Sequence, residues 1–474
     1  MATTSHTPLP TALVIFGASG NLSQIKLLPA LYELLAYNHL PKNFTVVAVL
    51  RGSSITLDSI LDRVELAMLR QGRTVDPAVL QRLRGLIRPI TMDSTKPEDY
   101  DRLRTMLDDL DAEFKVQHQR VFYLAIPPKI FMPVIECLGK AGLNIETGGV
   151  ARRIFVEKPF GRDLATATTL IDGIKEYFAE HQIYRIDHYL AKETAQNILT
   201  FRFRNPLVKS IWSREGIDYI HIRAIEKIDI EGRANFYDGM GALRDLIQSH
   251  LLQLMALVMM DAPREMKSAQ IHEQKAALLD AIKLPTEPID DFAVRGQYDN
   301  YREEAQNPDS HTETYALLRL GVDLPDWHGV PILLETGKAL DRKETSIEVV
   351  FRDREAASAA RNVLTIRIQP NEGISLQLAA KKPGFTNSVE PVTMEFSYES
   401  SFADNNPEAY ERVLYDAIVG DQTLFATSAE VLRSWEIIEP VIQHWETAPE
   451  FPSGYKKGSH GPAQASAIKK AVID

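Results

Sequence analysis

The sequence predicts an α/β domain followed by an α+β domain. In the first part of the 474-residue chain, short apolar strands alternate with helical patterns, as in a parallel sheet with helices on both faces. In the second part, strand-rich stretches carry interspersed helices, which favours a large, mostly antiparallel sheet. We place the first domain at residues 1–185 and the second at residues 186–474.

The elements of the first domain are predicted from short β-branched apolar runs and from helical apolar spacing. The predicted strands are Thr11–Phe16, Phe44–Leu50, Leu86–Met92, Val121–Ala125 and Arg153–Val156. The predicted helices cover residues 55–71, 77–85 and 129–141, together with one whose apolar positions are Leu27, Leu28, Leu31, Leu34 and Leu35.

The second domain is predicted to mix strands and helices. Helical pattern covers residues 192–202 and 238–261, and strands dominate residues 208–228 and 345–399. Residues 286–312 are rich in Asp, Glu, Gln and Pro and are expected to form a surface excursion. The tail beyond Pro452 is expected to pack loosely.

Composition excludes several classes of protein. The apolar fraction of 45% and charged fraction of 25% are typical of a soluble globular chain, and no apolar run approaches the roughly 20 residues of a membrane span. Met1–Thr11 lacks the features of a secretory signal, and one cysteine excludes a disulfide framework. The net charge of −11 argues against nucleic acid as a partner. We expect a cytoplasmic chain without membrane, nucleic-acid or metal partners.

A glycine-containing turn joins the first strand to the first helix. Glycines there allow a tight turn and close backbone approach, and the following helix N-terminus attracts phosphate. We therefore predict a Rossmann-like dinucleotide-binding domain; a glycine turn without a ligand is the alternative if the motif is taken alone. The predicted cofactor contacts in this turn are Gly17, Ala18, Ser19, Gly20, Asn21 and Leu22.

The residue after the second strand bears on the choice between NADP and NAD. An acid there would bind the ribose 2′-hydroxyl of NAD, whereas arginine suits the 2′-phosphate of NADP. Arg51 stands there without a neighbouring acid, so we predict NADP, with a solvated surface arginine as the alternative. Gly52, Ser53 and Ser54 add no second cation, which leaves NAD use open. Pro127 follows another strand, where it borders the cofactor or only stiffens a loop.

Residues 185–193 concentrate chemically distinct groups. Asp187, His188, Tyr189 and Lys192 supply an acid, an imidazole, a phenol and an ammonium. The carboxylate can orient an imidazole, and the other three groups together can hold a phosphate by donated hydrogen bonds. Because a nucleotide turn and the Lys-Pro motif Glu157–Gly161 precede this cluster, the order indicates a dehydrogenase acting on a phosphorylated substrate.

Two histidines compete for the role of general base in such a reaction. A histidine suits the removal of a hydroxyl proton as hydride leaves the same carbon. His188 lies in the cluster, and His250 lies on a predicted helix after Asp245. Since His250 shares a helical stripe with leucines, a satisfied core histidine is the alternative.

Segments spread over nearly the whole chain resemble glucose-6-phosphate dehydrogenases, in that family's order. They are Gly17–Leu22, Phe122–Pro128, Glu157–Gly161, Arg185–Lys192, Arg244–Gln253, Thr336–Lys338, Gln369–Glu372 and Gly420–Phe425. The resemblance implies oxidation of glucose 6-phosphate at C1 to the 6-phospholactone, with hydride transfer to NADP, in a homodimer or homotetramer.

The resemblance also implies the roles of individual residues. The implied catalytic residues are His250, the general base, and Asp187, its partner. The implied substrate-binding residues are Lys158, His188, Tyr189, Lys192, Glu226, Asp245, Lys338, Gln369 and Lys343. Lys158 is implied to reach the nicotinamide as well, and its following proline is implied to be cis. For Glu226 and Asp245, a strand-edge carboxylate and a helix salt-bridge partner are the alternatives.

Four residues depart from the family's usual pattern. Asn21 stands where aspartate is common, and Ile25 where a basic residue is common. Glu335 replaces an arginine, and His460 replaces a tryptophan. These departures bear on cofactor affinity, on substrate affinity and on the second, structural NADP of some animal members.

Two alternative functions remain from the sequence. One is a related dehydrogenase for another hexose phosphate or an unphosphorylated sugar, against which the intact phosphate cluster argues. The other is a catalytically silent binding or regulatory protein with the same fold. The presence of Lys158, Asp187 and His250 argues against that second alternative.

Overall fold

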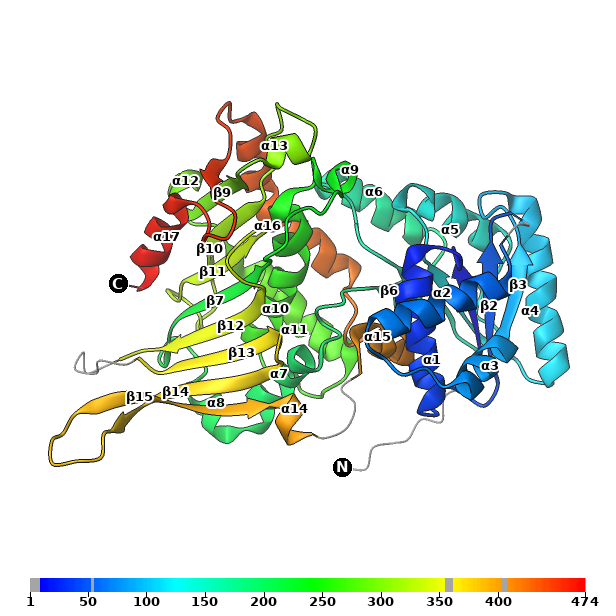
Figure 1. Ribbon diagram of the computed structural model, residues 1–474, viewed down its shortest axis with the longest axis horizontal. Coiled ribbons are helices and arrows are strands. Elements are labelled where there is room, and N and C mark those ends of the chain that lie inside the picture. The colour runs from blue at the N-terminus through cyan, green and yellow to red at the C-terminus, as the bar shows by residue number, and fades with distance from the viewer. Residues whose placement is uncertain (1–8, 53–54, 354–360, 403–406, 474) are drawn as a thin grey trace. The chain divides into compact units, whose positions relative to one another are not determined.

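The computed structural model describes residues 9–52, 55–353, 361–402 and 407–473 (Figure 1). Ser53, Ser54 and most of Met1–Thr11 lie outside the described residues. The chain forms two compact units. The N-terminal unit comprises residues 1–161, 165–191 and 407–428, and the C-terminal unit comprises residues 162–164, 192–406 and 429–474. No helix among the described residues is long and apolar enough to cross a membrane.

A six-stranded parallel sheet forms the centre of the N-terminal unit, in the order β3-β2-β1-β4-β5-β6. Every residue of β1 is buried, so both faces of the sheet are covered, as expected for a parallel sheet. This confirms the predicted Rossmann-like α/β class, although β6 was not predicted. The strands are β1 (Thr11–Phe16), β2 (Phe44–Leu50), β3 (Ile87–Thr91), β4 (Gln119–Leu124), β5 (Arg152–Val156) and β6 (Ile183–Arg185).

Helices flank this sheet, and local capping explains where several of them begin. The Thr56 hydroxyl accepts the Ser59 N–H at 3.2 Å, and Asp76 accepts the Ala78 N–H at 2.8 Å. Such caps stabilise a helix by about 1 kcal/mol each. The helices are η1 (Ser23–Leu27), α1 (Leu28–Ala36), α2 (Leu57–Arg70), α3 (Pro77–Leu86), η2 (Pro97–Asp99), α4 (Tyr100–Phe114), η3 (Pro128–Ile130), α5 (Phe131–Lys140), α6 (Leu164–Lys175), η4 (Glu180–Gln182) and α15 (Ala409–Val419).

Residues 407–428 complete the N-terminal unit although they come late in the chain. Val413, Leu414 and Ala417 of α15 are buried in the same core as α1 and the sheet. The Gln119 side chain donates to the Ile418 carbonyl at 2.6 Å, which ties this segment to β4.

A ten-stranded mixed sheet forms the C-terminal unit, in the order β15-β14-β13-β12-β7-β11-β10-β9-β16 with β8 beside β10. Most neighbours are antiparallel, whereas β7–β11 and β9–β16 are parallel, which confirms the predicted α+β class. The strands are β7 (Ile217–Ile225), β8 (Ile282–Lys283), β9 (Ala293–Tyr298), β10 (Tyr315–Val322), β11 (Ile332–Gly337), β12 (Glu344–Phe351), β13 (Val363–Gln369), β14 (Gly373–Lys381), β15 (Val389–Ser397) and β16 (Ser453–Tyr455).

Helices of the C-terminal unit pack on this sheet, with η5 against β7, β10 and β11. The helix η5 is a π-helix that continues directly into α10, so the predicted helix over 238–261 is two elements of different geometry. The helices are α7 (Glu193–Arg204), α8 (Pro206–Ile211), α9 (Ala234–Tyr237), η5 (Leu243–Leu251), α10 (Leu252–Met259), α11 (Ser268–Ala281), α12 (Ile289–Phe292), α13 (Tyr301–Glu304), α14 (Tyr398–Ser401), α16 (Ser428–Thr447) and α17 (Ala463–Ile473).

Three expectations for the second domain were wrong in part. Residues 208–211, within the stretch predicted as strand, belong to the helix α8, which Pro206 begins because its fixed backbone angle fits the first helical position. The segment 286–312 is not a mere surface excursion: it contains β9, and Tyr298 and Tyr301 are buried. The polar composition of that segment hid the few aromatic side chains, Tyr298 and Tyr301, that pack in the core.

The tail beyond Pro452 is also packed, contrary to the expectation. It adds β16 to the sheet beside β9, and Tyr455 is buried. Ala465 and Ile468 of α17 join the core of the C-terminal unit. The alternation of small and polar residues in the tail hid an amphipathic helix.

Candidate active site

The predicted cofactor turn lies between β1 and the first helix. Gly17 has a φ of +84°, and a Cβ there would lie 2.4 Å from the Ala125 carbonyl oxygen. Only glycine therefore fits, both for its backbone angle and for the approach to the end of β4. The Gly20 N–H donates to the Gly17 carbonyl at 2.9 Å and closes the turn.

Two buried polar side chains that the sequence analysis missed hold this turn from the helix side. Ser23 Oγ donates to the Gly17 carbonyl at 3.0 Å, and Gln24 Nε2 donates to the Ser19 carbonyl at 3.0 Å. Because both side chains are buried in η1, the turn is fixed before any ligand binds. The polar pair just before an apolar helix was the available signal.

Arg51 and Pro127 follow β2 and β4 at the same edge of the parallel sheet as the turn. Arg51 is exposed. Asp93, which follows β3, comes within electrostatic range of Arg51. The pKa of Asp93 is lowered chiefly by hydrogen bonds from Thr95 and further by the charge of Arg51. An acid thus lies near Arg51 in space although none neighbours it in sequence.

Lys158 follows β5, and its peptide bond to Pro159 is cis. Its neighbour Glu157 accepts a hydrogen bond from the Tyr123 hydroxyl at 2.6 Å. Burial raises the pKa of the Glu157 carboxyl to about 6, against the opposing effect of hydrogen bonds from Tyr123 and Tyr410. Glu157 therefore anchors the segment from which Lys158 projects.

The chemically rich cluster begins directly after β6. Asp187 is 4% exposed, and its Oδ1 accepts the Tyr189 N–H at 2.9 Å, which turns the chain after the strand. His188 is half-buried, with its ring centroid 5.1 Å from that of Tyr189. Arg185, the last residue of β6, forms an ion pair with Glu180 at 2.8 Å, which stabilises the end of the strand.

Lys192 belongs to the C-terminal unit, at the start of α7. Its Nζ lies 3.2 Å from Glu372 Oε1, and the Thr194 hydroxyl donates to Glu372 Oε2 at 3.2 Å. Glu372 ends the motif Gln369–Glu372 and was not among the predicted site residues. The Glu372 carboxylate thus orients the ammonium of Lys192, a residue predicted to bind the phosphate.

His250 and Asp245 both lie on the π-helix η5. His250 is 1% exposed, on the same side as Leu246, Ile247 and Leu251, whereas Asp245 is only half-buried. A π-helix shifts side chains relative to regular α-helical spacing and is frequent at functional sites. The predicted stripe placed His250 correctly among buried residues but did not reveal the π geometry.

Lys338 and Glu226 face each other at the ends of two neighbouring strands. Parallel pairing of β7 and β11 places Ile225 beside Gly337, so the residues that follow are adjacent. The Lys338 ammonium pairs with the Glu226 carboxylate and lies 5.1 Å from the centre of the Tyr237 ring. The structure therefore brings these two predicted substrate residues together.

The remaining predicted contacts, Gln369 and Lys343, lie at the same end of the paired strands, because the start of β12 pairs with the end of the antiparallel β13. Gln369 ends β13, and its side chain donates to the Thr345 hydroxyl at 3.2 Å. Its peptide bond to Pro370 is cis. Lys343 is exposed just before β12.

Comparison with known proteins places the chain in a family. The model for the NAD binding domain of glucose-6-phosphate dehydrogenase matches residues 14–197, and the model for the C-terminal domain matches residues 199–472. The chain belongs to the glucose-6-phosphate dehydrogenase family. Its N-terminal unit is thus the nicotinamide-dinucleotide domain of that family.

Individual relatives cover nearly the whole chain. Glucose-6-phosphate 1-dehydrogenase 2 of Mycobacterium tuberculosis is 39% identical, over 96% of this chain and 91% of the relative. Glucose-6-phosphate 1-dehydrogenase of Chlamydia muridarum is 38% identical, over 97% of this chain and 95% of the relative. A solved glucose-6-phosphate dehydrogenase in complex with its substrate glucose-6-phosphate superimposes with a TM-score of 0.91, at 31% identity, covering 100% and 99% of the two chains.

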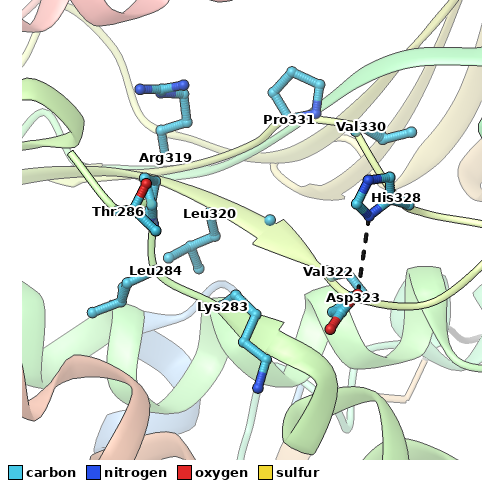
Figure 2. A pocket seen from close by; sticks show the side chains of 13 residues that line it. Lys283, Leu284, Thr286, Arg319, Leu320, Val322, Asp323, His328, Val330 and Pro331 are labelled. Atoms are coloured by element: carbon cyan, nitrogen blue, oxygen red, sulfur yellow. Dashed lines mark ion pairs between the residues drawn. The ribbon is translucent and has the colours of Figure 1, made fainter.

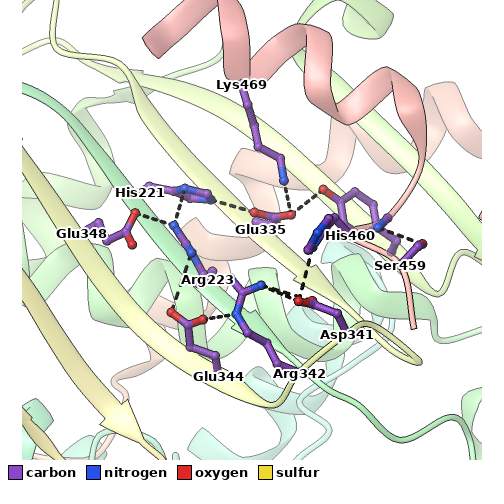
Figure 3. A network of polar contacts seen from close by, with 12 residues as sticks. His221, Arg223, Glu335, Asp341, Arg342, Glu344, Glu348, Ser459, His460 and Lys469 are labelled. Carbon is purple, nitrogen blue, oxygen red and sulfur yellow. Dashed lines mark hydrogen bonds and ion pairs between the residues drawn. The ribbon is translucent and has the colours of Figure 1, made fainter. Parts of the chain in front are cut away.

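Glu335, one departure from the family pattern, lies in a buried charge network (Figure 3). Its carboxylate lies 2.9 Å from His221 Nε2 and 2.5 Å from Lys469 Nζ, and it accepts the Tyr315 hydroxyl at 2.7 Å. Arg223 donates to His221 Nδ1 at 3.0 Å, so a neutral imidazole with its proton on Nε2 fits between them. Accordingly, burial and Arg223 lower the pKa of His221.

This network explains the acidic residue at position 335, because the ion pair of Glu335 with Lys469 links the helix α17 to the strand β11. His460, a second departure, lies at the edge of the same region with Nδ1 3.3 Å from Asp341 Oδ2. Asn21 and Ile25 lie on the exposed side of the first helical turns. The structure gives no specific contact that explains these last two.

A cavity of about 490 Å³ lies elsewhere in the C-terminal unit (Figure 2). It is lined by apolar side chains such as Leu284, Leu320 and Val330, with Lys283 and Arg319 at its edge. None of its lining residues belongs to the predicted site.

Proposed function

We propose that this chain oxidises glucose 6-phosphate at C1 to 6-phosphoglucono-1,5-lactone and transfers the hydride to NADP. Family membership over nearly the whole chain carries this proposal. The relatives from Mycobacterium tuberculosis and Chlamydia muridarum bear the corresponding enzyme name, and one solved relative holds glucose-6-phosphate. Every residue to which the family pattern gives a catalytic role is present.

The cofactor residues fit a dinucleotide by their local geometry. The turn from Gly17 to Leu22 leads into a helix N-terminus, where free N–H groups suit a pyrophosphate. Arg51 would bind the 2′-phosphate, and Pro127 and Lys158 would border the nicotinamide. When bound, the nicotinamide accepts the hydride at C4.

The substrate residues divide into a phosphate group and a chemical group. His188, Tyr189 and Lys192 donate hydrogen bonds to the 6-phosphate, with Lys192 oriented by Glu372. Lys338, Gln369 and Lys343 add contacts from the sheet of the C-terminal unit. The carboxylates of Glu226 and Asp245 accept hydrogen bonds from sugar hydroxyls.

The proton leaves the C1 hydroxyl as the hydride leaves C1. His250 accepts this proton, since a histidine exchanges protons near neutral pH. Asp187 acts as its carboxylate partner and stabilises the imidazolium that forms.

NADP preference rests on Arg51, with partial use of NAD retained. The guanidinium offers a bidentate donor to a 2′-phosphate. The nearby Asp93 carboxylate would repel that phosphate and reduces the preference. We therefore propose NADP as the preferred cofactor and NAD as a weaker one.

A homodimer or homotetramer is part of this proposal. The outer strand β15 exposes apolar side chains on both faces, Val392 and Met394 on one and Val389 on the other. Exposed edges of this kind usually pair or are covered. A cytoplasmic location is proposed as well, in keeping with the single, buried cysteine Cys137.

Initial rates of nicotinamide reduction test the proposed function. Glucose 6-phosphate and free glucose are each combined with NADP and with NAD, using purified wild-type protein. We expect turnover with glucose 6-phosphate, faster with NADP, and far slower turnover with glucose. Absence of turnover by folded protein in all four combinations would overturn the proposal, and preference for glucose would point to a related sugar dehydrogenase.

A further inference from the structure

A buried carboxylate outside the predicted site holds the start of the π-helix η5. Glu313, 5% exposed, accepts the Leu243 N–H on its Oε1 at 2.9 Å. Its own backbone carbonyl accepts the Ala242 N–H at 3.0 Å. These two bonds satisfy N–H groups at the helix start that have no partner within the helix. They therefore fix the end of the helix that carries Asp245 and His250.

The contact between this carboxylate and the helix start is specific in shape and charge. Gly241 has a φ of +75°, and a Cβ there would lie 2.3 Å from Glu313 Oε1. Burial raises the pKa of the Glu313 carboxyl, while the Leu243 N–H and the charges of Arg244 and Arg295 oppose that rise. The Glu313 side chain is thus a closely packed cap of the helix η5, and nearby positive charges partly offset the cost of burying its carboxylate.

The next residue, Thr314, contacts the backbone of Lys338, the proposed substrate lysine. Its carbonyl accepts the Lys338 N–H at 2.8 Å. The Tyr455 hydroxyl donates to the Lys338 carbonyl at 2.7 Å and lies 2.8 Å from the Thr314 hydroxyl, which can donate to it. Tyr455 is 4% exposed and comes from β16 in the C-terminal tail.

We propose that Glu313 and Tyr455 are positioning residues that hold the helix of His250 and the backbone of Lys338 in a fixed mutual arrangement. The dipeptide Glu313–Thr314 joins the two segments, because its first residue bonds the helix and its second bonds the lysine. This inference rests on the proposed function, in which His250 and Lys338 act on the same sugar. Neither Glu313 nor Tyr455 is a predicted substrate contact.

Two substitutions at Glu313 test the cap. Glu313→Ala removes the acceptor, so kcat with glucose 6-phosphate should fall about 10-fold or more, as expected when a reacting group shifts by a fraction of an ångström. Glu313→Gln keeps an oxygen that accepts the Leu243 N–H and should restore kcat to within about 2-fold of wild type. The dissociation constant of NADPH, measured by fluorescence titration, should not change in either variant.

Glu430→Gln is the matched control. Glu430 is also a fully buried carboxylate of the C-terminal unit, but it pairs with Lys275 at 2.9 Å and His272 at 2.8 Å, between α11 and α16. It should lower the melting temperature while kcat stays within about 2-fold of wild type, because the helix of His250 is untouched.

Tyr455→Phe provides a second test should Glu313→Ala fail to fold. It removes one hydroxyl and keeps the packed ring, so KM for glucose 6-phosphate should rise several-fold through the displaced Lys338, roughly 3-fold to 10-fold for a lost buried hydrogen bond. Wild-type kinetics in Tyr455→Phe, or in a folded Glu313→Ala, with only a lower melting temperature, would overturn the inference. Failure of wild-type protein to oxidise glucose 6-phosphate would instead overturn the proposed function.

Discussion

Glu372 holds the ammonium of Lys192 at 3.2 Å and accepts the Thr194 hydroxyl with its other oxygen. The carboxylate thus reaches across from the loop after β13 to the first turn of α7. It restricts a long side chain that would otherwise lose rotamer entropy on binding a phosphate. A pre-oriented ammonium is what a phosphate site of the proposed kind requires.

Replacing Lys192 should weaken phosphate recognition selectively. In Lys192→Gln we expect KM for glucose 6-phosphate to rise roughly 10-fold to 100-fold, the value of one charge-assisted hydrogen bond to phosphate. The slow rate with free glucose should stay unchanged, because glucose has no phosphate to bind. Steady-state kinetics with both sugars measure this, and Lys209→Gln on α8 is the exposed-lysine control. An equal loss with both sugars would contradict the assigned role.

Replacing Arg51 should reduce the preference for NADP. In Arg51→Ala, kcat/KM for NADP should fall roughly 10-fold to 100-fold, while the value for NAD should stay within about 3-fold, since only NADP carries the 2′-phosphate. The ratio of the two values is the measured quantity. Arg82→Ala, an exposed arginine on α3, should leave the ratio unchanged. A parallel fall with both cofactors would show that Arg51 supports the fold rather than the phosphate.

The buried network around Glu335 should contribute strongly to stability. Removing one partner of a buried charge pair costs roughly 3–5 kcal/mol, so Glu335→Gln should lower the free energy of unfolding by an amount near the lower end. Burial alone would raise the pKa of Glu335, but His221 and Lys469 outweigh it and lower the pKa.

Because that pKa is lowered, the stabilisation by Glu335 is present at neutral pH and is lost only as the pH falls below its ordinary value of 4.5. The difference in urea stability between wild type and Glu335→Gln should therefore shrink in acid. Lys469→Met, which removes the more exposed partner, should cost less. A difference that is absent at neutral pH would refute the role of the network.

Glu157 should contribute the opposite pH dependence. Burial raises its pKa from 4.5 to about 6, so the folded state favours the protonated carboxyl. The contribution to stability is full below pH 4.5 and is lost as the pH rises through about 6. Glu157→Gln keeps an acceptor for Tyr123, so its melting temperature relative to wild type should increase between these pH values. A constant difference across that range would contradict the raised pKa.

The sequence predicted the local elements well where one residue pattern decided them. The run Thr11–Phe16 followed by Gly17 gave a strand and a tight turn, because a continuous apolar, β-branched run and a glycine act within a few residues. The sequence did not predict that α15 packs beside α1. Val413 and Leu414 are apolar residues of an amphipathic helix, and that pattern does not say which element they contact. Contacts between distant segments leave little local trace.

The same distinction holds for the candidate site. Motifs identified Lys192 and Lys338. They gave no role to Glu372, which lies in one of the motifs, and did not include Glu313 or Tyr455. The π geometry around His250 was also unpredictable, because apolar spacing fits an α-helix nearly as well. Local chemistry is readable in the sequence, whereas its support comes from tertiary packing.

We propose that His250 accepts the proton of the C1 hydroxyl of glucose 6-phosphate while the hydride leaves C1. The most direct measurement compares kcat of wild type and His250→Asn with NADP, together with binding of glucose 6-phosphate by calorimetry. We predict a fall in kcat of roughly 100-fold to 10,000-fold with binding preserved, because general-base catalysis typically contributes 10²–10⁴ in rate. A variant that binds glucose 6-phosphate and retains more than about a tenth of wild-type kcat would contradict the account, since no such base contributes so little.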